Sequence, residues 1–168
     1  MNMHRALFPL AAISCFLAST PVLSAQRGTV DIQYVQPSKF TDFNIYGRGP
    51  QWSASYFAGQ IGHGLTPAVE RKVAGGRLTL RFTDIDLAGH SHSRGGSSVR
   101  IVRGEIRPAR MAFAFVLQDS SGRTLASGST RISDNSSQRS LAHHPQRSGG
   151  LYYEKRMLEQ WLRSLKTS

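Results

Sequence analysis

The sequence predicts an α+β fold, in which an antiparallel sheet of four to five strands has helices packed on one face. Two observations lead to this class. Several short stretches between positions 29 and 132 alternate apolar and polar residues, which is the period of half-buried strands. Residues 53–74 and 151–166 instead carry apolar residues at helical spacing.

The first expected strand covers residues 29–35. Val30, Ile32 and Tyr34 alternate with polar residues there and share one face of the strand. The following residues 39–51 are rich in Gly, Pro, Asn and Asp, which are typical of turns. We therefore expect a loop in that segment.

Residues 53–74 give two conflicting signals. Their apolar side chains recur every four positions, which favours a helix. Several glycines and Pro67 lie in the same segment, and a proline inside a helix removes a backbone hydrogen-bond donor. We therefore expect two helical pieces with a break at residues 63–66, the second with Pro67 in its first turn.

Four more strands are expected in the middle of the chain. Leu78, Leu80 and Phe82 alternate with polar residues and predict a strand with one face in water. The apolar phase shifts by one residue at positions 84–87, which predicts a bulge or the end of this strand. The other three are expected at residues 99–107, 111–117 and 124–132.

Apolar residues occupy both faces of the stretch 111–117, which predicts the central strand of the sheet. Residues 119–122 predict a hairpin turn into the last strand. Small and polar residues dominate the stretches 88–97 and 133–150, and both are expected to be loops.

Residues 151–166 predict a closing amphipathic helix. Its apolar residues fill one half of the helix circumference. Trp161 lies in the middle of that stripe and is expected to be the main buried anchor. Glu154 is the exception, because it projects among the apolar residues, and we expect it to meet an arginine of the sheet.

Residues 1–25 predict a secretory signal peptide. His4 and Arg5 precede an apolar run, and small residues lead to a cleavage site after Ala25. The run is too short and too interrupted to span a bilayer. The alternative is a lipoprotein signal with Cys15 as the lipidated residue, although the apolar run continues past it. The expected location is the bacterial periplasm or the medium, with no transmembrane span in the mature chain.

The mature chain, residues 26–168, is expected to form one basic domain. Removing residues 1–25 takes away Arg5 and no acidic residue, which leaves 20 Lys and Arg against 10 Asp and Glu. The same cleavage removes the only cysteine, so no disulfide framework can form. A hydrophobic core must therefore stabilise the domain, and the chain is long enough to build one.

Two stretches resemble a family of bacterial proteins. Residues 76–89 (GRLTLRFTDIDLAG) are similar to a strand motif ending in D-x-D-L-A-G, and residues 153–161 (YEKRMLEQW) are similar to a helix motif Y-E-K-x-M-L-x-x-W. Both belong to the family catalogued as domain of unknown function 3016, and the resemblance covers nearly all of the mature chain. It implies export and lends no activity. The chain departs from the family in the many glycines of residues 53–74.

Histidines are the candidate metal ligands. His90 and His92 lie in one expected loop, and His143 and His144 lie in another. Zinc or copper sites need three or four such groups to converge. The sequence does not show that these loops meet, and exposed histidines are ordinary in segments of this composition. No metal or cofactor is therefore predicted, with His90 and His92 as the weak candidates.

Acidic residues offer no clear catalytic pattern. Asp84 and Asp86 share one face if the strand stays regular, which would suit paired acid–base chemistry. No nucleophile accompanies them, and acids at a strand end more often accept hydrogen bonds from the backbone or face basic neighbours. The sequence also contains no phosphate loop, dinucleotide fingerprint or Gly-x-Ser-x-Gly motif. A non-catalytic role is favoured.

Arginine is the most distinctive surface residue. Eight arginines lie on or beside the expected strands: Arg77, Arg81, Arg100, Arg103, Arg107, Arg110, Arg123 and Arg131. The candidate binding residues are Arg77, Arg81, Arg100 and Arg103. The guanidinium group pairs with carboxylates and phosphates, whereas export and the lack of an aromatic-plus-basic motif disfavour nucleic acid.

The predicted function is that of a non-catalytic envelope module. It would bind or scaffold an anionic partner, such as an envelope component or an acidic protein, through the basic face of the sheet. Two alternatives remain open. One is a basic surface with no specific partner, and the other is a metal-binding or hydrolytic enzyme that uses the histidine loops.

Overall fold

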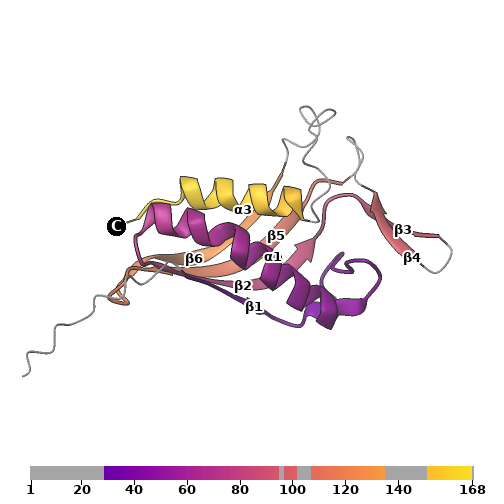
Figure 1. Ribbon diagram of the computed structural model, residues 1–168, viewed down its shortest axis with the longest axis horizontal. Helices are drawn as coiled ribbons and strands as arrows, with labels where there is room; N and C mark the ends of the chain where they lie inside the picture. The colour runs from indigo at the N-terminus through magenta and orange to yellow at the C-terminus, as the bar shows by residue number, and fades with distance from the viewer. Residues whose placement is uncertain (1–28, 95–96, 102–106, 135–150, 168) are drawn as a thin grey trace, which may run out of the picture.

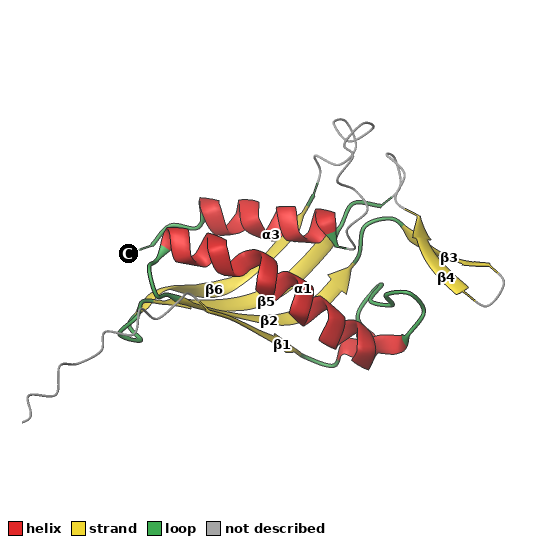
Figure 2. Cartoon of the chain, viewed as in Figure 1, coloured by secondary structure: helices red, strands yellow, loops and turns green. Residues whose placement is uncertain are grey.

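The structure, a computed structural model, describes residues 29–94, 97–101, 107–134 and 151–167. These residues form a four-stranded sheet with two helices on one face and a separate two-stranded sheet (Figures 1 and 2). The elements are β1 (Thr29–Tyr34), η1 (Pro37–Lys39), α1 (Gly49–Lys72), β2 (Arg77–Asp86), β3 (His90–Arg94), β4 (Ser97–Ile101), β5 (Arg110–Gln118), β6 (Thr124–Ser133) and α3 (Tyr152–Ser164). The α+β class is confirmed.

The main sheet is mixed rather than antiparallel. Its strand order is β1-β2-β5-β6, and β2 is antiparallel to β5, as β5 is to β6. β1 and β2 run parallel, with Thr29 opposite Arg77 and Tyr34 opposite Phe82. The prediction of an antiparallel sheet was therefore wrong at this pair. The reason is the crossover helix α1, which returns the chain to the end of the sheet where β1 starts.

α1 is one continuous helix, and the predicted break at residues 63–66 is absent. Phe57, Ile61 and Leu65 are fully buried on its inner face. Burying each such side chain contributes about 1.5–3 kcal/mol, whereas Pro67 inside the helix costs about 3 kcal/mol. Tertiary burial of the apolar stripe therefore outweighs the local preference for a break.

The glycines of α1 lie where other elements approach the helix. A Cβ atom at Gly62 would lie 4.0 Å from the carbonyl oxygen of Val30 on β1. A Cβ atom at Gly64 would lie 3.4 Å from the Lys155 side chain of α3. These residues therefore permit close packing instead of interrupting the helix.

The loop expected at residues 39–51 is shorter than predicted, because α1 begins at Gly49. Pro50, which suggested a loop, lies in the first turn, where a proline leaves no intrahelical hydrogen bond unmade. The preceding loop is fixed to the helix start. The hydroxyl of Ser53 accepts a hydrogen bond from the Ile45 N–H at 2.9 Å.

The predicted strands at residues 29–35, 77–83, 111–117 and 124–132 correspond to β1, β2, β5 and β6. The register of β2 shifts between Phe82 and Asp84, which confirms the predicted bulge. β5 lies between β2 and β6, as expected of a central strand. Only one of its faces is buried, however, because Met111, Phe113, Phe115 and Leu117 point into the core and the residues between them do not.

The loop predicted at residues 88–97 was partly wrong, because β3 and β4 pair there as an antiparallel hairpin, with His90 opposite Ile101. Histidine and serine are both polar, so no alternation of apolar and polar residues along β3 indicated a strand. The strand expected at residues 99–107 overlaps β4. Residues 102–106, and the loop expected at 135–150, lie outside the described residues.

α3 closes the core as predicted. Met157, Leu158 and Leu162 are buried against the sheet. The prediction that Trp161 is the main buried anchor was wrong, because Trp161 is only half-buried, although its ring contacts Phe113 and Phe115 edge-on, with centroid distances of 4.8 and 5.0 Å. Within the described residues, none of the helices has the length and apolarity needed to cross a membrane. The predicted signal peptide lies outside these residues.

Candidate functional site on the open face of the sheet

The four-stranded sheet has one face that the described helices do not cover. α1 and α3 both lie on the opposite face (Figure 1). We call the uncovered side the open face. It displays Thr29, Asp31 and Gln33 of β1, Arg77, Thr79, Arg81, Asp84 and Asp86 of β2, Arg110, Ala112, Ala114, Val116 and Gln118 of β5, and Ser127, Ser129, Arg131 and Ser133 of β6.

Four arginines of the open face are exposed: Arg77, Arg81, Arg110 and Arg131. The ion pairs found among the described residues lie elsewhere and involve none of these four. Only one carboxylate of this face, that of Asp31, is exposed, whereas Asp84 is half-buried and Asp86 is buried. Positive groups therefore dominate what the open face presents to solvent.

The residues of β5 that lie beside the arginines of β2 have short side chains. Arg77 and Arg81 are four residues apart on β2, which separates their Cα atoms by about 13 Å. Arg81 lies opposite Ala114, and the neighbouring positions of β5 carry only Ala112 and Val116. This arrangement can pair guanidinium groups with carboxylates or phosphates spaced along an extended partner.

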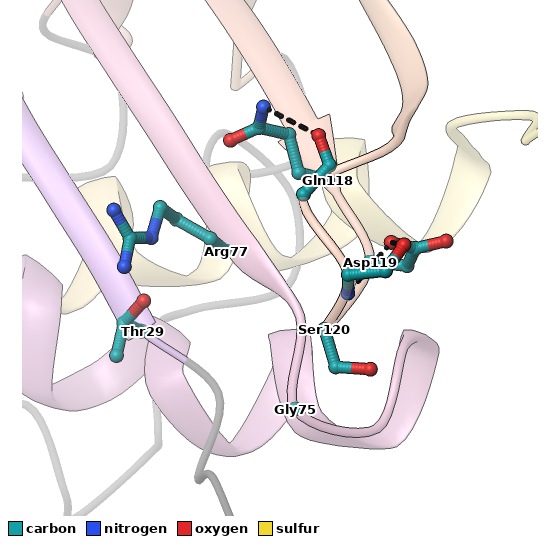
Figure 3. Close-up of a pocket in the computed structure, with 8 residues that line it drawn as sticks. Thr29, Gly75, Arg77, Gln118, Asp119 and Ser120 are labelled. Carbon is teal, nitrogen blue, oxygen red and sulfur yellow. Dashed lines mark hydrogen bonds between the residues drawn. The ribbon is translucent and has the colours of Figure 1, made fainter.

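A hollow of about 280 Å³ lies at one end of the open face, beside the turn between β5 and β6. Arg77 and Thr29 project beside it from neighbouring strands (Figure 3). The turn is fixed by Asp119, which accepts hydrogen bonds from the backbone N–H groups of Ser121 and Arg123 at 2.9 and 3.0 Å. A further hydrogen bond from the Ser121 hydroxyl is the largest of the effects that lower the pKa of Asp119 to about 2.

A larger hollow of about 470 Å³ lies at the other end of the open face. Strand register places two rows of side chains across it: Asp84, Ala112 and Arg131 in one row, and Asp86, Arg110 and Ser133 in the next. The methyl group of Ala112 leaves open the space between the longer side chains around it. We call this space the Ala112 hollow.

Asp84 and Asp86 both line the Ala112 hollow, so they share one face of β2. Asp84 is used structurally. Its two carboxylate oxygens accept hydrogen bonds from the N–H and the hydroxyl of Thr41, at 2.8 and 3.0 Å. This is the backbone-satisfying role that we expected for an acid at a strand end.

Asp86 differs from Asp84 in having an unsatisfied oxygen. Its residue exposure is 8%, and its Oδ1 atom is buried with no hydrogen-bond partner among the described residues. Burial raises the pKa of Asp86, and the neighbouring carboxylate of Asp42 raises it further. Arg107 and Arg110 act in the opposite direction.

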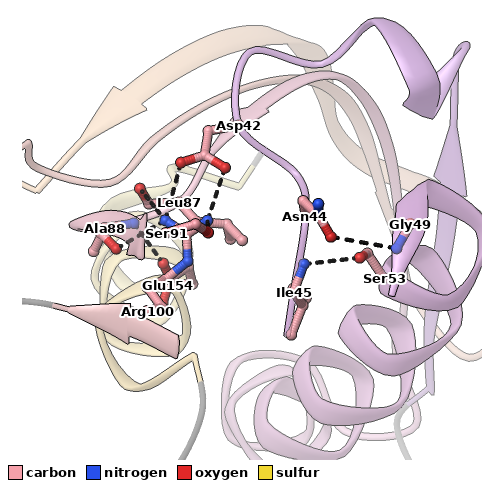
Figure 4. A network of polar contacts seen from close by, with 10 residues as sticks. All are labelled: Asp42, Asn44, Ile45, Gly49, Ser53, Leu87, Ala88, Ser91, Arg100 and Glu154. Carbon is pink, nitrogen blue, oxygen red and sulfur yellow. Dashed lines mark hydrogen bonds and ion pairs between the residues drawn. The ribbon is translucent and has the colours of Figure 1, made fainter. Parts of the chain in front are cut away.

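A polar network fixes the chain where β2 ends (Figure 4). Arg100 of β4 donates hydrogen bonds to both oxygens of Asp42, at 2.8 and 3.1 Å, and to the carbonyls of Leu87 and Ala88. Glu154 of α3, with 3% exposure, accepts a hydrogen bond from the Ala88 N–H at 2.9 Å. Burial raises the pKa of Glu154, and the hydrogen bond from Ala88 and the charge of Arg100 oppose that rise. The arginine near Glu154 thus comes from the hairpin, not from the main sheet.

The predicted binding arginines do not all lie together. Arg77 and Arg81 share the open face, as expected from the alternation of β2. Arg100 belongs to the separate two-stranded sheet and is engaged with Asp42. Arg103 lies outside the described residues. The candidate site therefore keeps only the first two of the four.

Arg110 and Arg131 join the candidate site, although the sequence did not single them out for it. Their alternation with apolar residues on β5 and β6 was visible. What places them near each other is the register, which sets Ala112 opposite Arg131 and Arg110 opposite Ser133. The Ala112 hollow was also missed. The only sign of it in the sequence is a small residue, Ala112, and this residue lies on a strand that carries apolar residues on both faces.

Of the four candidate metal ligands, the structure describes the side chain of His90. His90 and His92 are two residues apart on β3, and the Nδ1 atom of His90 is buried without a hydrogen-bond partner there. His143 and His144 lie outside the described residues. Within those residues, no group of three or more His, Cys, Asp or Glu side chains could hold a metal ion.

The family model described as "Protein of unknown function (DUF3016)" matches residues 28–164. The chain belongs to the DUF3016 family. The resemblance seen in the sequence is therefore confirmed. A comparison with curated proteins gives no match to this DUF3016 chain.

The two stretches that carried the DUF3016 resemblance meet in the structure. Residues 76–89 contain β2 and the turn after it, and residues 153–161 lie in α3. The hydrogen bond from Ala88 to Glu154 joins them (Figure 4). The DUF3016 stretches therefore build the end of β2, next to the Ala112 hollow.

Proposed function

We propose that the protein is an exported, non-catalytic module of the bacterial envelope that binds an extended anionic partner on the open face. The observation that carries this proposal is a single one. Four exposed arginines, with no ion-pair partner among the described residues, share one sheet face that the described helices leave uncovered.

The chemistry of the open face favours an anionic partner over a nucleic acid. Guanidinium groups form bidentate hydrogen bonds with carboxylates and phosphates. Proteins that bind single-stranded nucleic acid add aromatic side chains on which bases stack. The strand residues assigned to the open face include no aromatic side chain, since the phenylalanines of β2 and β5 point into the core.

The use of the acidic residues supports a non-catalytic role. Asp84 is bonded to Thr41, and Asp42 is paired with Arg100. Both carboxylates hold backbone segments in place, so neither is free to serve as the second member of an acid–base pair. The charged groups that the open face exposes are mainly arginine donors, which suits binding of an anion.

Export is the second part of the proposal, and it rests on the signal-like residues 1–25. Mass spectrometry of protein exported by a bacterial host should show a mature chain that starts close to Gln26, without lipid. A lipid-modified chain starting at Cys15 would contradict this cleavage and support the lipoprotein alternative. An uncleaved product confined to the cytoplasm would contradict export.

Binding is tested by retention on anionic surfaces across a salt series. The purified protein is passed over a carboxylated polysaccharide and, separately, mixed with vesicles that carry phosphate headgroups, with neutral surfaces as controls. Retention should fall as salt rises, because the Debye length shrinks from about 10 Å at 0.1 M to about 3 Å at 1 M. The two arms distinguish carboxylate from phosphate partners. Retention on neither surface at low salt would overturn the proposal.

A further inference from the structure

We propose that the Ala112 hollow binds a zwitterionic group, in which an ammonium lies a few bonds from a carboxylate or a phosphate. The inference rests in part on the proposed function, since the hollow lies on the open face. It goes further by naming the chemistry of the group that is bound.

The ammonium side of the ligand is inferred from Asp86. This residue lines the hollow, is 8% exposed, and has an Oδ1 atom without a hydrogen-bond partner among the described residues. A buried carboxylate without a donor is costly. An ammonium supplies both a positive charge and three donors. Burial and the nearby Asp42 raise the pKa of Asp86, whereas Arg107 and Arg110 lower it.

A metal ion is a poorer fit to this carboxylate than an ammonium. Asp84, the other acid of the hollow, already accepts two hydrogen bonds from Thr41. Within the described residues, no cluster of three or more potential ligands could hold a metal. The cation that meets Asp86 is therefore inferred to be organic.

The acidic side of the ligand is inferred from Arg110 and Arg131. Both are exposed, both line the hollow, and neither forms an ion pair with a described residue. Arg110 lies directly opposite Asp86 in the register of β2 and β5. Directly paired residues of antiparallel strands have Cα atoms about 4.5–5.5 Å apart. The two charges of the ligand must therefore also be close together.

The size of the hollow suits a small group. Its volume of about 470 Å³ falls in the range of about 300–1,000 Å³ that is usual for ligand pockets. Ala112 forms its floor, so a longer side chain at this position would fill it without changing any charge. Ala114 is the matched control, because it follows Ala112 on the same face of β5 and does not line the hollow.

The first test compares four probes by calorimetric titration of the purified protein. O-phosphoethanolamine and glycine carry both charges, inorganic phosphate carries only the anion, and ethanolamine carries only the cation. At least one zwitterion should bind about ten-fold more tightly than either single-charge probe, which corresponds to about 1.4 kcal/mol. Preference for O-phosphoethanolamine would indicate a lipid headgroup as the source, and preference for glycine an amino acid or peptide end. Phosphate binding as tightly as both zwitterions, or no binding at all, would overturn the proposal.

The second test uses variants of the hollow. Ala112→Leu should weaken binding of the preferred zwitterion about ten-fold, while Ala114→Leu should leave it unchanged. Asp86→Asn should weaken the zwitterion but not phosphate. If circular dichroism shows that Ala112→Leu does not fold, Arg131→Gln, a change at an exposed residue, replaces it. This variant should bind both the preferred zwitterion and inorganic phosphate more weakly. Unchanged binding in the folded variants would contradict the inference.

The same titrations separate this inference from the proposed function. Arg77 and Arg81 do not line the Ala112 hollow. The double variant Arg77→Gln with Arg81→Gln should therefore bind the zwitterion as the parent protein does, even when it no longer binds an anionic surface. Loss of both properties together would show that the hollow is not a site of its own.

Discussion

The buried carboxylate of Glu154 accepts a hydrogen bond from the backbone N–H of Ala88 at 2.9 Å, and this bond ties the first turn of α3 to the end of β2. The carboxylate lies near the start of a helix, where the macrodipole favours negative charge. Burial works against that charge and raises the pKa of Glu154. A carboxylate whose charged form is disfavoured by burial thus connects the helix layer to the sheet.

Replacing Glu154 with glutamine should change how stability depends on pH. Because the folded-state pKa is raised above the ordinary 4.5, the folded protein binds this proton more tightly than the unfolded chain does. The contribution of Glu154 to the free energy of unfolding is therefore largest below the ordinary pKa of 4.5. It is lost as the pH rises through the raised pKa of the folded state. Glu154→Gln keeps an oxygen for Ala88 and carries no charge, so the fall should become smaller.

The measurement is urea unfolding of Glu154→Gln and the parent protein at several pH values from acid to neutral. Glu159→Gln is the control, because this side chain is partly exposed in a surface ion pair with Arg163 on the same helix. The control should keep the pH dependence of the parent. Parallel curves for the parent and Glu154→Gln would show that the buried carboxylate does not titrate differently on folding.

Arg100→Ala should destabilise the fold strongly. Arg100 pairs with Asp42 through side chains that are only 15% and 20% exposed, and it also donates to two backbone carbonyls. Removing one partner of a mostly buried pair leaves the other charge uncompensated, and we expect a loss of about 2–4 kcal/mol. Arg123→Ala breaks a surface pair, with the Arg123 side chain 74% exposed, and should cost less than about 1 kcal/mol.

Chemical denaturation of both arginine variants checks this difference. A cost for Arg100→Ala as small as that for Arg123→Ala would show that the network at the end of β2 is not needed for the fold. Arg100 would then be available for binding, as the sequence suggested, and the candidate site would have to include it.

Trp161→Ala should cost about 2–4 kcal/mol, because its ring packs edge-on against Phe113 and Phe115 while remaining partly exposed. The protein has one other tryptophan in its sequence, Trp52. Trp52 stacks on Tyr56 near the start of α1, outside the contact between α3 and the sheet. Trp52→Ala should therefore cost less, about 1 kcal/mol. Equal losses in thermal unfolding would contradict the contribution of Trp161 to the packing of α3 on the sheet.

Much of the fold was accessible from the sequence because burial follows simple periods. Leu78, Leu80 and Phe82 alternate on β2, and the phase shift after them marked the bulge correctly. The errors arose where tertiary packing overrides local preference. The glycines and Pro67 of α1 looked like helix breakers, but the helix is continuous because its apolar stripe is buried and its glycines meet neighbouring elements.

Less of the candidate site could be predicted, because it depends on register between strands. The alternation of β2 placed Arg77 and Arg81 on a wet face. No local pattern revealed that Ala112 stands between Asp84 and Arg131, since these residues come from three strands. The parallel pairing of β1 with β2 was missed although a helical segment was expected between them, which is the connection that parallel strands need.

The central claim is that the open face, rather than overall charge, binds an anionic partner. It is tested by comparing two double variants that each remove two positive charges. Arg77→Gln with Arg81→Gln alters the open face, whereas Arg71→Gln with Lys166→Gln alters exposed positions on α1 and just beyond α3. Both variants are measured for binding to the anionic surface that retains the parent protein, at about 0.1 M salt. We predict about ten-fold weaker binding for the open-face variant and nearly unchanged binding for the other. Equal weakening of both variants, with both folded, would contradict the account.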